Sequence, residues 1–147
     1  MSTNIYFKLW TPIIGLHALH QLEESISFFQ WYIDYAYKIP KWLLILNLNI
    51  AEMATSHREY FIVASVAQIF FVSLIAFIFR HKENMTKFLI FIYLLGLTFF
   101  FVWHILSSYF AQSYAPIMVT CLIGLYLIPI WIYKLFRLRD KKLSTTN

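Results

Sequence analysis

Long apolar runs separated by short polar segments dominate this chain. Residues 61–79 form nineteen consecutive positions without a charge, close to the roughly 20 residues that an α-helix needs to cross a bilayer. From Phe88 to Tyr133 the chain contains no Asp, Glu, Lys or Arg, which is too long for one crossing and fits a hairpin of two. The pattern therefore predicts transmembrane helices.

The polar breaks between the runs indicate where these helices begin and end. A charged cluster over residues 80–87 separates the first clear run from the next. The second break lies at 112–116, where Pro116 suits the first turn of a helix and disfavours helix at the residue before it. We therefore expect spans at about 58–79, 86–110 and 116–136.

The N-terminal third is less apolar. Residues 5–29 are apolar overall but carry four ionisable side chains in their second half. We expect a first span here, with an amphipathic helix on the membrane surface as the alternative. Residues 41–57 are helix-like but short for a crossing, so we expect an interfacial or re-entrant helix. The predicted fold is an all-α, polytopic membrane protein, a single domain over residues 1–147 with four transmembrane helices in a bundle plus this short helix.

Composition and charge support this class and indicate an orientation. Hydrophobic residues make up 61% of the chain and charged residues only 13%, too few charges to cover a water-soluble domain. Basic residues gather at 80–87 and 134–142, beside the ends of apolar segments, which is typical of cytoplasmic loops rather than of a nucleic-acid surface. With four crossings, we expect both termini in the cytoplasm, membrane lipids as partners, and no nucleic-acid partner.

The candidate chemistry lies in the second half of the first predicted span. At about 100° per residue, His17, His20 and Glu24 share one stripe of the helix, and Glu23 lies beside them. Ionisable groups at membrane depth cost about 2.5–3.5 kcal/mol each and need partners. At a rise of about 1.5 Å per residue, His104 lies at the level of His20 in the outer part of the bilayer. Further candidate partners come from the short helix, namely Asn49, Glu52 and His57.

Three interpretations of these side chains stay open. In the first, a divalent transition metal such as zinc, iron or manganese is bound by imidazoles and carboxylates, with the ligands drawn from His20, Glu23, Glu24, Glu52 and His104. In the second, no metal is bound, and the catalytic groups His20, Glu23, Glu24 and His104 exchange protons with a lipid-like substrate. In the third, histidine and glutamate form a buried ion-pair network that holds the helices together.

These interpretations correspond to different classes of function. A membrane enzyme acting on a lipid-like substrate ranks first, and a structural or interaction protein second. A proton-coupled carrier ranks last, because the inner half of the predicted bundle offers few polar residues to line a route across the membrane. Two uncharged polar residues, Ser65 and Gln68, are expected to form hydrogen bonds between helices rather than to bind a substrate.

Three landmarks in order along the chain resemble a known family. They are the string His20-Gln21-Leu22-Glu23-Glu24, the later His104, and Tyr114-Ala115-Pro116 leading into Thr120. This set is similar to the family of small membrane proteins named for its HXXEE motif, whose function is unknown. The resemblance implies a membrane protein with a site at these positions, and no particular reaction. The chain has Ile117 where the family pattern has glycine.

Overall fold

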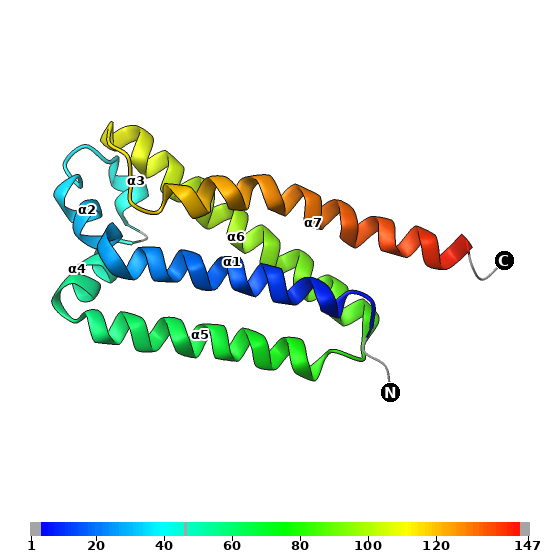
Figure 1. Cartoon of the computed structure of the whole chain (residues 1–147). Helices are drawn as coiled ribbons and strands as arrows, with labels where there is room; N and C mark the ends of the chain where they lie inside the picture. The colour runs from blue at the N-terminus through cyan, green and yellow to red at the C-terminus, as the bar shows by residue number, and fades with distance from the viewer. Residues whose placement is uncertain (1–3, 46, 145–147) are drawn as a thin grey trace.

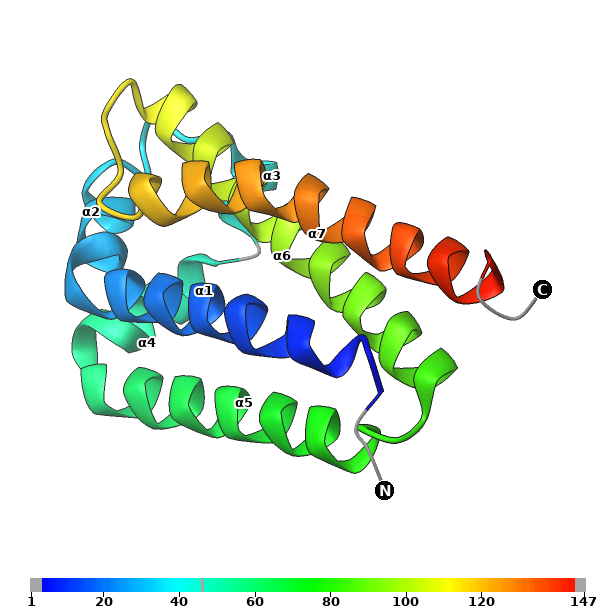
Figure 2. The same ribbon diagram turned by 45° about the vertical axis from the view of Figure 1, so that its right-hand side comes forward.

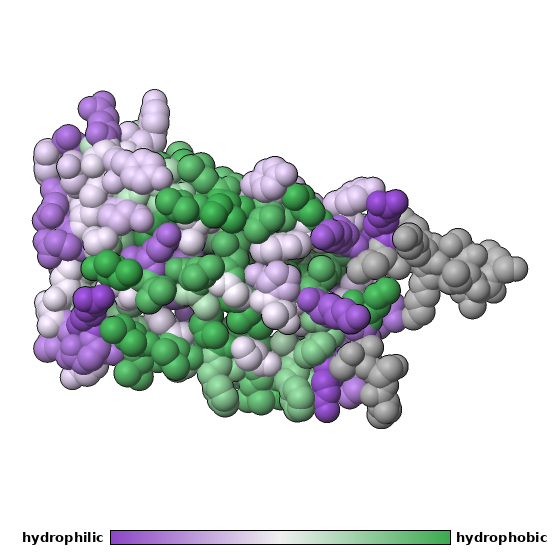
Figure 3. Space-filling model, viewed as in Figure 1, coloured by the Kyte–Doolittle hydropathy of each residue, from purple (hydrophilic) through white to green (hydrophobic). Residues whose placement is uncertain are grey.

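The computed structural model describes residues 4–45 and 47–144, and beyond Arg137 the backbone alone. All regular structure in the described residues is helical, as the apolar pattern predicted. Three helices are long and apolar enough to cross a membrane. They are α5 (Arg58–Ile78), α6 (Glu83–Ala111), and the part of α7 (Met118–Ser144) up to Arg137. Figure 3 shows the consequence, an apolar belt between two polar ends, which is the surface of a multi-pass membrane protein.

The break between α6 and α7 falls where the sequence predicted it. Gln112 adopts a left-handed conformation with φ 50° and ends α6. The Ser113 amide then donates to the carbonyl of Ser108, which satisfies one of the last carbonyls of the helix. Helix α7 begins at Met118, two residues later than predicted, because Pro116 lies in the turn rather than in the first helical turn.

One continuous helical run forms the N-terminal part of the described chain. It consists of a 3₁₀ turn, η1 (Phe7–Leu9), helix α1 (Trp10–Glu23), a π-helical turn, η2 (Glu24–Phe28), and helix α2 (Phe29–Asp34). Helix α1 packs against α5, α6 and α7, and Figures 1 and 2 show it running alongside α5. This run is not one of the three candidate spans, so its crossing of the membrane stays a prediction.

The predicted helix over 41–57 consists of two shorter pieces. Helix α3 (Lys41–Leu44) and helix α4 (Leu48–Ser56) lie at one end of the bundle (Figure 1). Helix α4 packs against α2 and α5, and its buried side carries Ala51 and Ala54. Small residues on that side let the short helix lie close against its neighbours.

The packing between α6 and α7 depends on one glycine. A Cβ atom on Gly124 would overlap the ring of Phe101, so no larger residue fits there unless that ring moves. The Phe101 ring in turn contacts His20 edge-on, with centroids 4.9 Å apart. The close approach of α7 to α6 therefore presses an aromatic ring against one of the candidate site residues.

Candidate functional site

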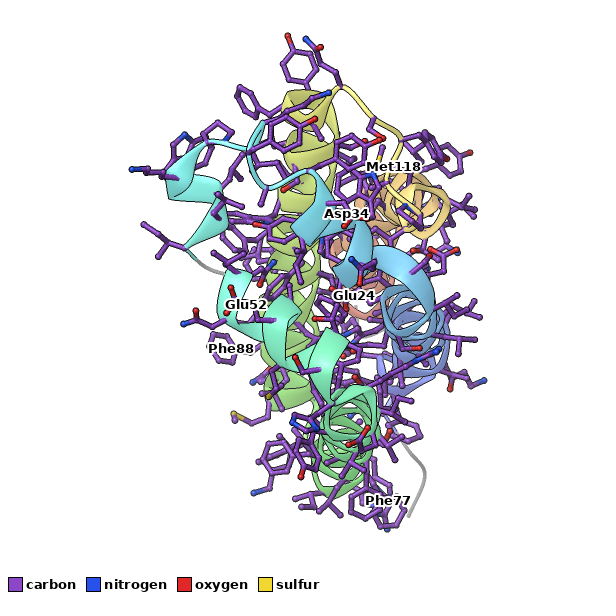
Figure 4. The ribbon with its side chains drawn as sticks, turned by 90° about the vertical axis from the view of Figure 1, so that its left-hand side faces the viewer. Glu24, Asp34, Glu52, Phe77, Phe88 and Met118 are labelled. Atoms are coloured by element: carbon purple, nitrogen blue, oxygen red, sulfur yellow. The ribbon has the colours of Figure 1, made fainter. Side chains whose placement is uncertain are left out.

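Three of the predicted residues converge inside the bundle. His20 comes from α1, Glu24 from the start of η2, and His104 from α6. One potential ligand atom from each lies within 4.8 Å of the other two. The His20 and His104 ring centroids are 5.0 Å apart, and His104 Nε2 lies 3.4 Å from Glu24 Oε1. Both histidines are buried, and Figure 4 shows Glu24 near the centre of the bundle.

Local structure explains why these side chains point to one place. His20 and Glu24 are four residues apart, so they lie on the same face of the helix. The π-helical turn begins at Glu24, and such turns are frequent at functional sites. The same turn buries Phe28, whose ring packs edge-on against His104 at 4.7 Å. With Phe101 against His20, each imidazole is held by an aromatic ring.

Thr120 connects Glu23, the first glutamate of the motif, to His20. Its Oγ1 lies 2.6 Å from Glu23 Oε2 and 2.8 Å from His20 Nδ1. A hydroxyl has one hydrogen, and the short contact to the carboxylate assigns it to Glu23. The same oxygen then accepts a hydrogen bond from His20 Nδ1–H. Glu23 therefore orients His20 through Thr120, and the lone pair of neutral His20 lies on Nε2.

That lone pair has no partner in the described structure. His20 Nε2 and both ring nitrogens of His104 are buried and form no hydrogen bond with any described residue. A buried polar group without a partner costs about 1–3 kcal/mol. Ligands at about 2.0–2.2 Å from one ion lie about 3–3.5 Å from one another. The potential ligand atoms of His20, Glu24 and His104 are at present within 4.8 Å of one another, so a modest rotation of the side chains would allow all three to bind one metal ion. Two imidazoles and a carboxylate are a donor set that suits zinc, iron or manganese.

A cavity of about 520 Å³ adjoins this cluster. Its volume lies within the range of about 300–1,000 Å³ of pockets that enclose small ligands. His20, Glu24 and His104 all line it. Most of the remaining lining is apolar, including Phe61 and Leu97. The three potential metal ligands therefore face a space in which a largely apolar molecule would fit.

A second polar group lines the same cavity and contains no carboxylate. Gln21 Nε2 donates to His17 Nε2 at 3.1 Å and to Gln68 Oε1 at 3.3 Å, and Gln21 Oε1 accepts from Ser65 Oγ at 2.6 Å. His17 Nδ1 is hydrogen-bonded to the Tyr93 hydroxyl. The prediction that Ser65 and Gln68 bond between helices is confirmed, and their shared partner is Gln21.

The structure does not bring the residues of the short helix to the cluster. Asn49 and Glu52 are exposed on α4, and Figure 4 shows Glu52 away from Glu24. His57 is exposed and lies 3.5 Å from Glu59. Their sequence positions indicated membrane depth but not the rotation of the helix, and the rotation turns alanines inward.

Two residues of the site had no assigned role in the sequence. Thr120 belongs to the resemblance, but nothing in its position along the chain indicated a contact with His20 one hundred residues earlier. Tyr93 lies in a long apolar run, where tyrosine is usually an anchor or a packing residue. Only the crossing of α1 with α6 and α7 brings either one to the histidines.

Comparison with known proteins agrees with the landmarks in the sequence. No curated protein and no solved structure matches the chain. Residues 11–133 match a family described as proteins of unknown function with an HXXEE motif. In this chain the motif is the segment from His20 to Glu24, which supplies two members of the cluster and the glutamate that supports one of them. The chain therefore belongs to the HXXEE family.

Proposed function

We propose that the cluster binds a divalent transition metal and that the protein is a membrane enzyme acting on a lipid-like substrate. The observation that carries the proposal is the arrangement around His20. Its Nδ1–H is held through Thr120 by Glu23, while its buried Nε2 forms no hydrogen bond with a described residue. One ring nitrogen of His20 lies within 4.8 Å of potential ligand atoms of Glu24 and His104. Histidine ligands of metals usually donate their other ring N–H to such a supporting group.

The number of ligands supports a catalytic rather than a structural metal. Structural zinc sites use four protein ligands, whereas catalytic sites use three and leave a position for water or substrate. The described residues supply three, and the cavity lies beside them. A metal held there would activate a bound water or polarise a bound oxygen. The three side chains would hold it, and the apolar walls would limit the access of bulk water.

The proposal includes a fourth membrane span formed by the N-terminal helical run. At its start, Asn4 donates to the carbonyl of Arg80 and to Thr86 Oγ1, at the turn between α5 and α6. The run ends at Asp34, at the opposite end of the bundle beside α4. It therefore runs the length of the bundle parallel to the other spans. Four crossings with cytoplasmic basic loops would place both termini in the cytoplasm and the cluster in the outer half of the membrane.

This topology can be tested with single cysteines in a Cys121→Ser background. Tyr114 is exposed in the α6–α7 turn, and Asn84 lies at the start of α6, at the other end of that helix. A membrane-impermeant maleimide should label Tyr114→Cys in intact cells and Asn84→Cys only after permeabilisation. The reverse pattern would invert the orientation, and labelling of both in intact cells would contradict it.

A structural role is the second candidate. It is favoured by the contact of 3.4 Å between His104 Nε2 and Glu24 Oε1, which could be a buried ion pair without metal. Such a pair leaves His20 Nε2 without a partner among the described residues. The two candidates therefore differ in what occupies the space between the three side chains.

Elemental analysis of purified protein distinguishes them. The wild type should contain close to one transition-metal ion per chain, and the His20→Ala/Glu24→Ala double variant should contain none. A matched control is His57→Ala/Glu59→Gln, which removes an exposed histidine–glutamate pair and should leave the metal content unchanged. Absence of metal from wild type purified without chelators, and after incubation with zinc, iron and manganese salts, would reject the metal site and favour the structural role.

A further inference from the structure

The side chains that line the cavity beside the cluster indicate the charge of the ligand that it would bind. The polar side chains other than the cluster that line it include His17, Gln21 and Tyr93, and no Lys or Arg is among the described residues of its lining. An anionic headgroup in a low-dielectric site requires a cationic partner. Apart from the cluster, the described walls offer only uncharged hydrogen-bonding groups and apolar surface. The charge of a divalent ion in the cluster would be balanced by the carboxylates of Glu24 and the neighbouring Glu23. The lining therefore favours a neutral ligand.

The hydrogen-bond directions in this wall leave the hydroxyl hydrogen of Tyr93 available. Gln21 donates an N–H to His17 Nε2, so the proton of neutral His17 lies on Nδ1. That N–H then donates to the oxygen of Tyr93. No other hydrogen bond of the Tyr93 hydroxyl occurs among the described residues, so its hydrogen is available to a ligand. The group it would bind is an uncharged oxygen acceptor, either a carbonyl or a hydroxyl.

The positions of the helices indicate how such a ligand would enter. On one side, the Gln21–Ser65 hydrogen bond joins α1 to α5. On the other side, the cavity is lined by Ile92 and Phe100 of α6, each 49% exposed, and by exposed Ala64 of α5. All three lie within helices long and apolar enough to cross the membrane. The cavity walls contributed by α5 and α6 are therefore partly exposed on the apolar surface of these helices.

We propose that this cavity binds a single uncharged, long-chain lipid with a hydroxyl or carbonyl oxygen. The lipid enters between α5 and α6. Its oxygen accepts a hydrogen bond from Tyr93, and its apolar chain lies against the walls formed by residues such as Phe61 and Leu97. The inference rests on the proposed function insofar as it makes this lipid the substrate of the metal centre. Its binding can nevertheless be measured without turnover.

The experiment uses a hexadecanol analogue with a diazirine on its chain, in phosphatidylcholine nanodiscs containing the whole protein. After irradiation, mass spectrometry should locate adducts on cavity residues such as Met53 and Phe100. Added hexadecanol should suppress this labelling, whereas equal mole fractions of palmitate or phosphatidylglycerol should not. Adducts spread evenly over the lipid-facing helices, or stronger competition by either anion, would overturn the proposal.

Variants test the same proposal through the site itself. Tyr93→Phe removes one neutral hydrogen bond and should weaken competition by hexadecanol by about 2- to 10-fold. Gly96 lines the cavity with open space beside it, so Gly96→Leu should abolish cavity labelling. Gly15 is also open but does not line the cavity, so Gly15→Leu should label like wild type. Unchanged labelling in both Tyr93→Phe and Gly96→Leu would overturn the proposal.

Metal content, measured on the same samples, separates this inference from the proposed function. Tyr93→Phe and Gly96→Leu should keep the metal of the wild type, because neither residue belongs to the cluster. Bound metal without cavity labelling would reject the lipid and leave the metal site intact. Cavity labelling suppressed by hexadecanol in a protein without metal would support the lipid site and reject the metal-dependent enzyme.

Discussion

The protein contains two histidine–glutamate pairs with nearly the same separation and different surroundings. His104 and Glu24 are 3.4 Å apart with side chains 1% and 12% exposed, whereas His57 and Glu59 are 3.5 Å apart and 57% and 66% exposed. An exposed pair contributes about 0–1 kcal/mol to stability. A buried pair bears a desolvation cost that its mutual attraction offsets only with further bonds. Geometry alone therefore does not distinguish the two pairs, and burial does.

The buried pair is also the one that has a third member. His20 completes the group with Glu24 and His104, and Phe28 and Phe101 pack against the two imidazoles. Among the described residues, the exposed pair has one ring contact, between His57 and Tyr60, whose tilted rings have centroids 5.1 Å apart. A buried pair with an additional unsatisfied nitrogen is expected where another ligand, here the proposed metal, compensates the cost of burial.

The largest expected difference between the pairs comes from removing their histidines. His104→Ala leaves the Glu24 carboxylate buried without its partner, so the free energy of unfolding should fall by about 3–5 kcal/mol. His57→Ala should lower it by less than about 1 kcal/mol. Denaturant unfolding of both variants in detergent micelles, beside the wild type, measures the contrast. Equal losses would show that burial does not distinguish the pairs.

The two glutamates of the motif should differ next. Glu24→Gln removes a metal ligand and should abolish stoichiometric binding, whereas Glu23→Gln acts only through Thr120 and should weaken metal affinity by about 10–100-fold. Isothermal titration of metal-depleted protein measures both. Glu59→Gln, in the exposed pair, is the control and should bind like wild type. Stronger loss in Glu23→Gln than in Glu24→Gln would exchange the roles assigned to the two carboxylates.

Much of this architecture follows from the apolar pattern of the sequence. The three candidate spans begin and end within a few residues of the predicted positions, because long uncharged runs have few alternatives to crossing a membrane. The shared depth of His20 and His104 could also be anticipated from the helical rise and the topology. These features depend on counting residues along single helices.

Features that depend on rotation and crossing of helices could not be predicted. Glu52 was predicted at the depth of the histidines but lies on the exposed side of α4. The contact of Thr120 with His20 requires the particular approach of α7 to α1. The π-helical turn after Glu23 contains no proline or glycine from which it could be predicted. It is the side-chain packing across helices, absent from a one-dimensional pattern, that determines these positions.

The smallest expected effect tests whether packing holds the buried pair in place. Gly124→Ala pushes a methyl group against Phe101, and such overpacking costs about 1–3 kcal/mol. Because Phe101 supports His20, this variant should also weaken metal affinity. Gly15→Ala, another helical glycine but with open space around it, should instead be neutral or stabilise the helix by about 0.5–1 kcal/mol. If thermal unfolding and metal titration gave the same result for both alanines, the aromatic ring would not be what positions His20, and the difference between the two histidine–glutamate pairs would rest on desolvation alone.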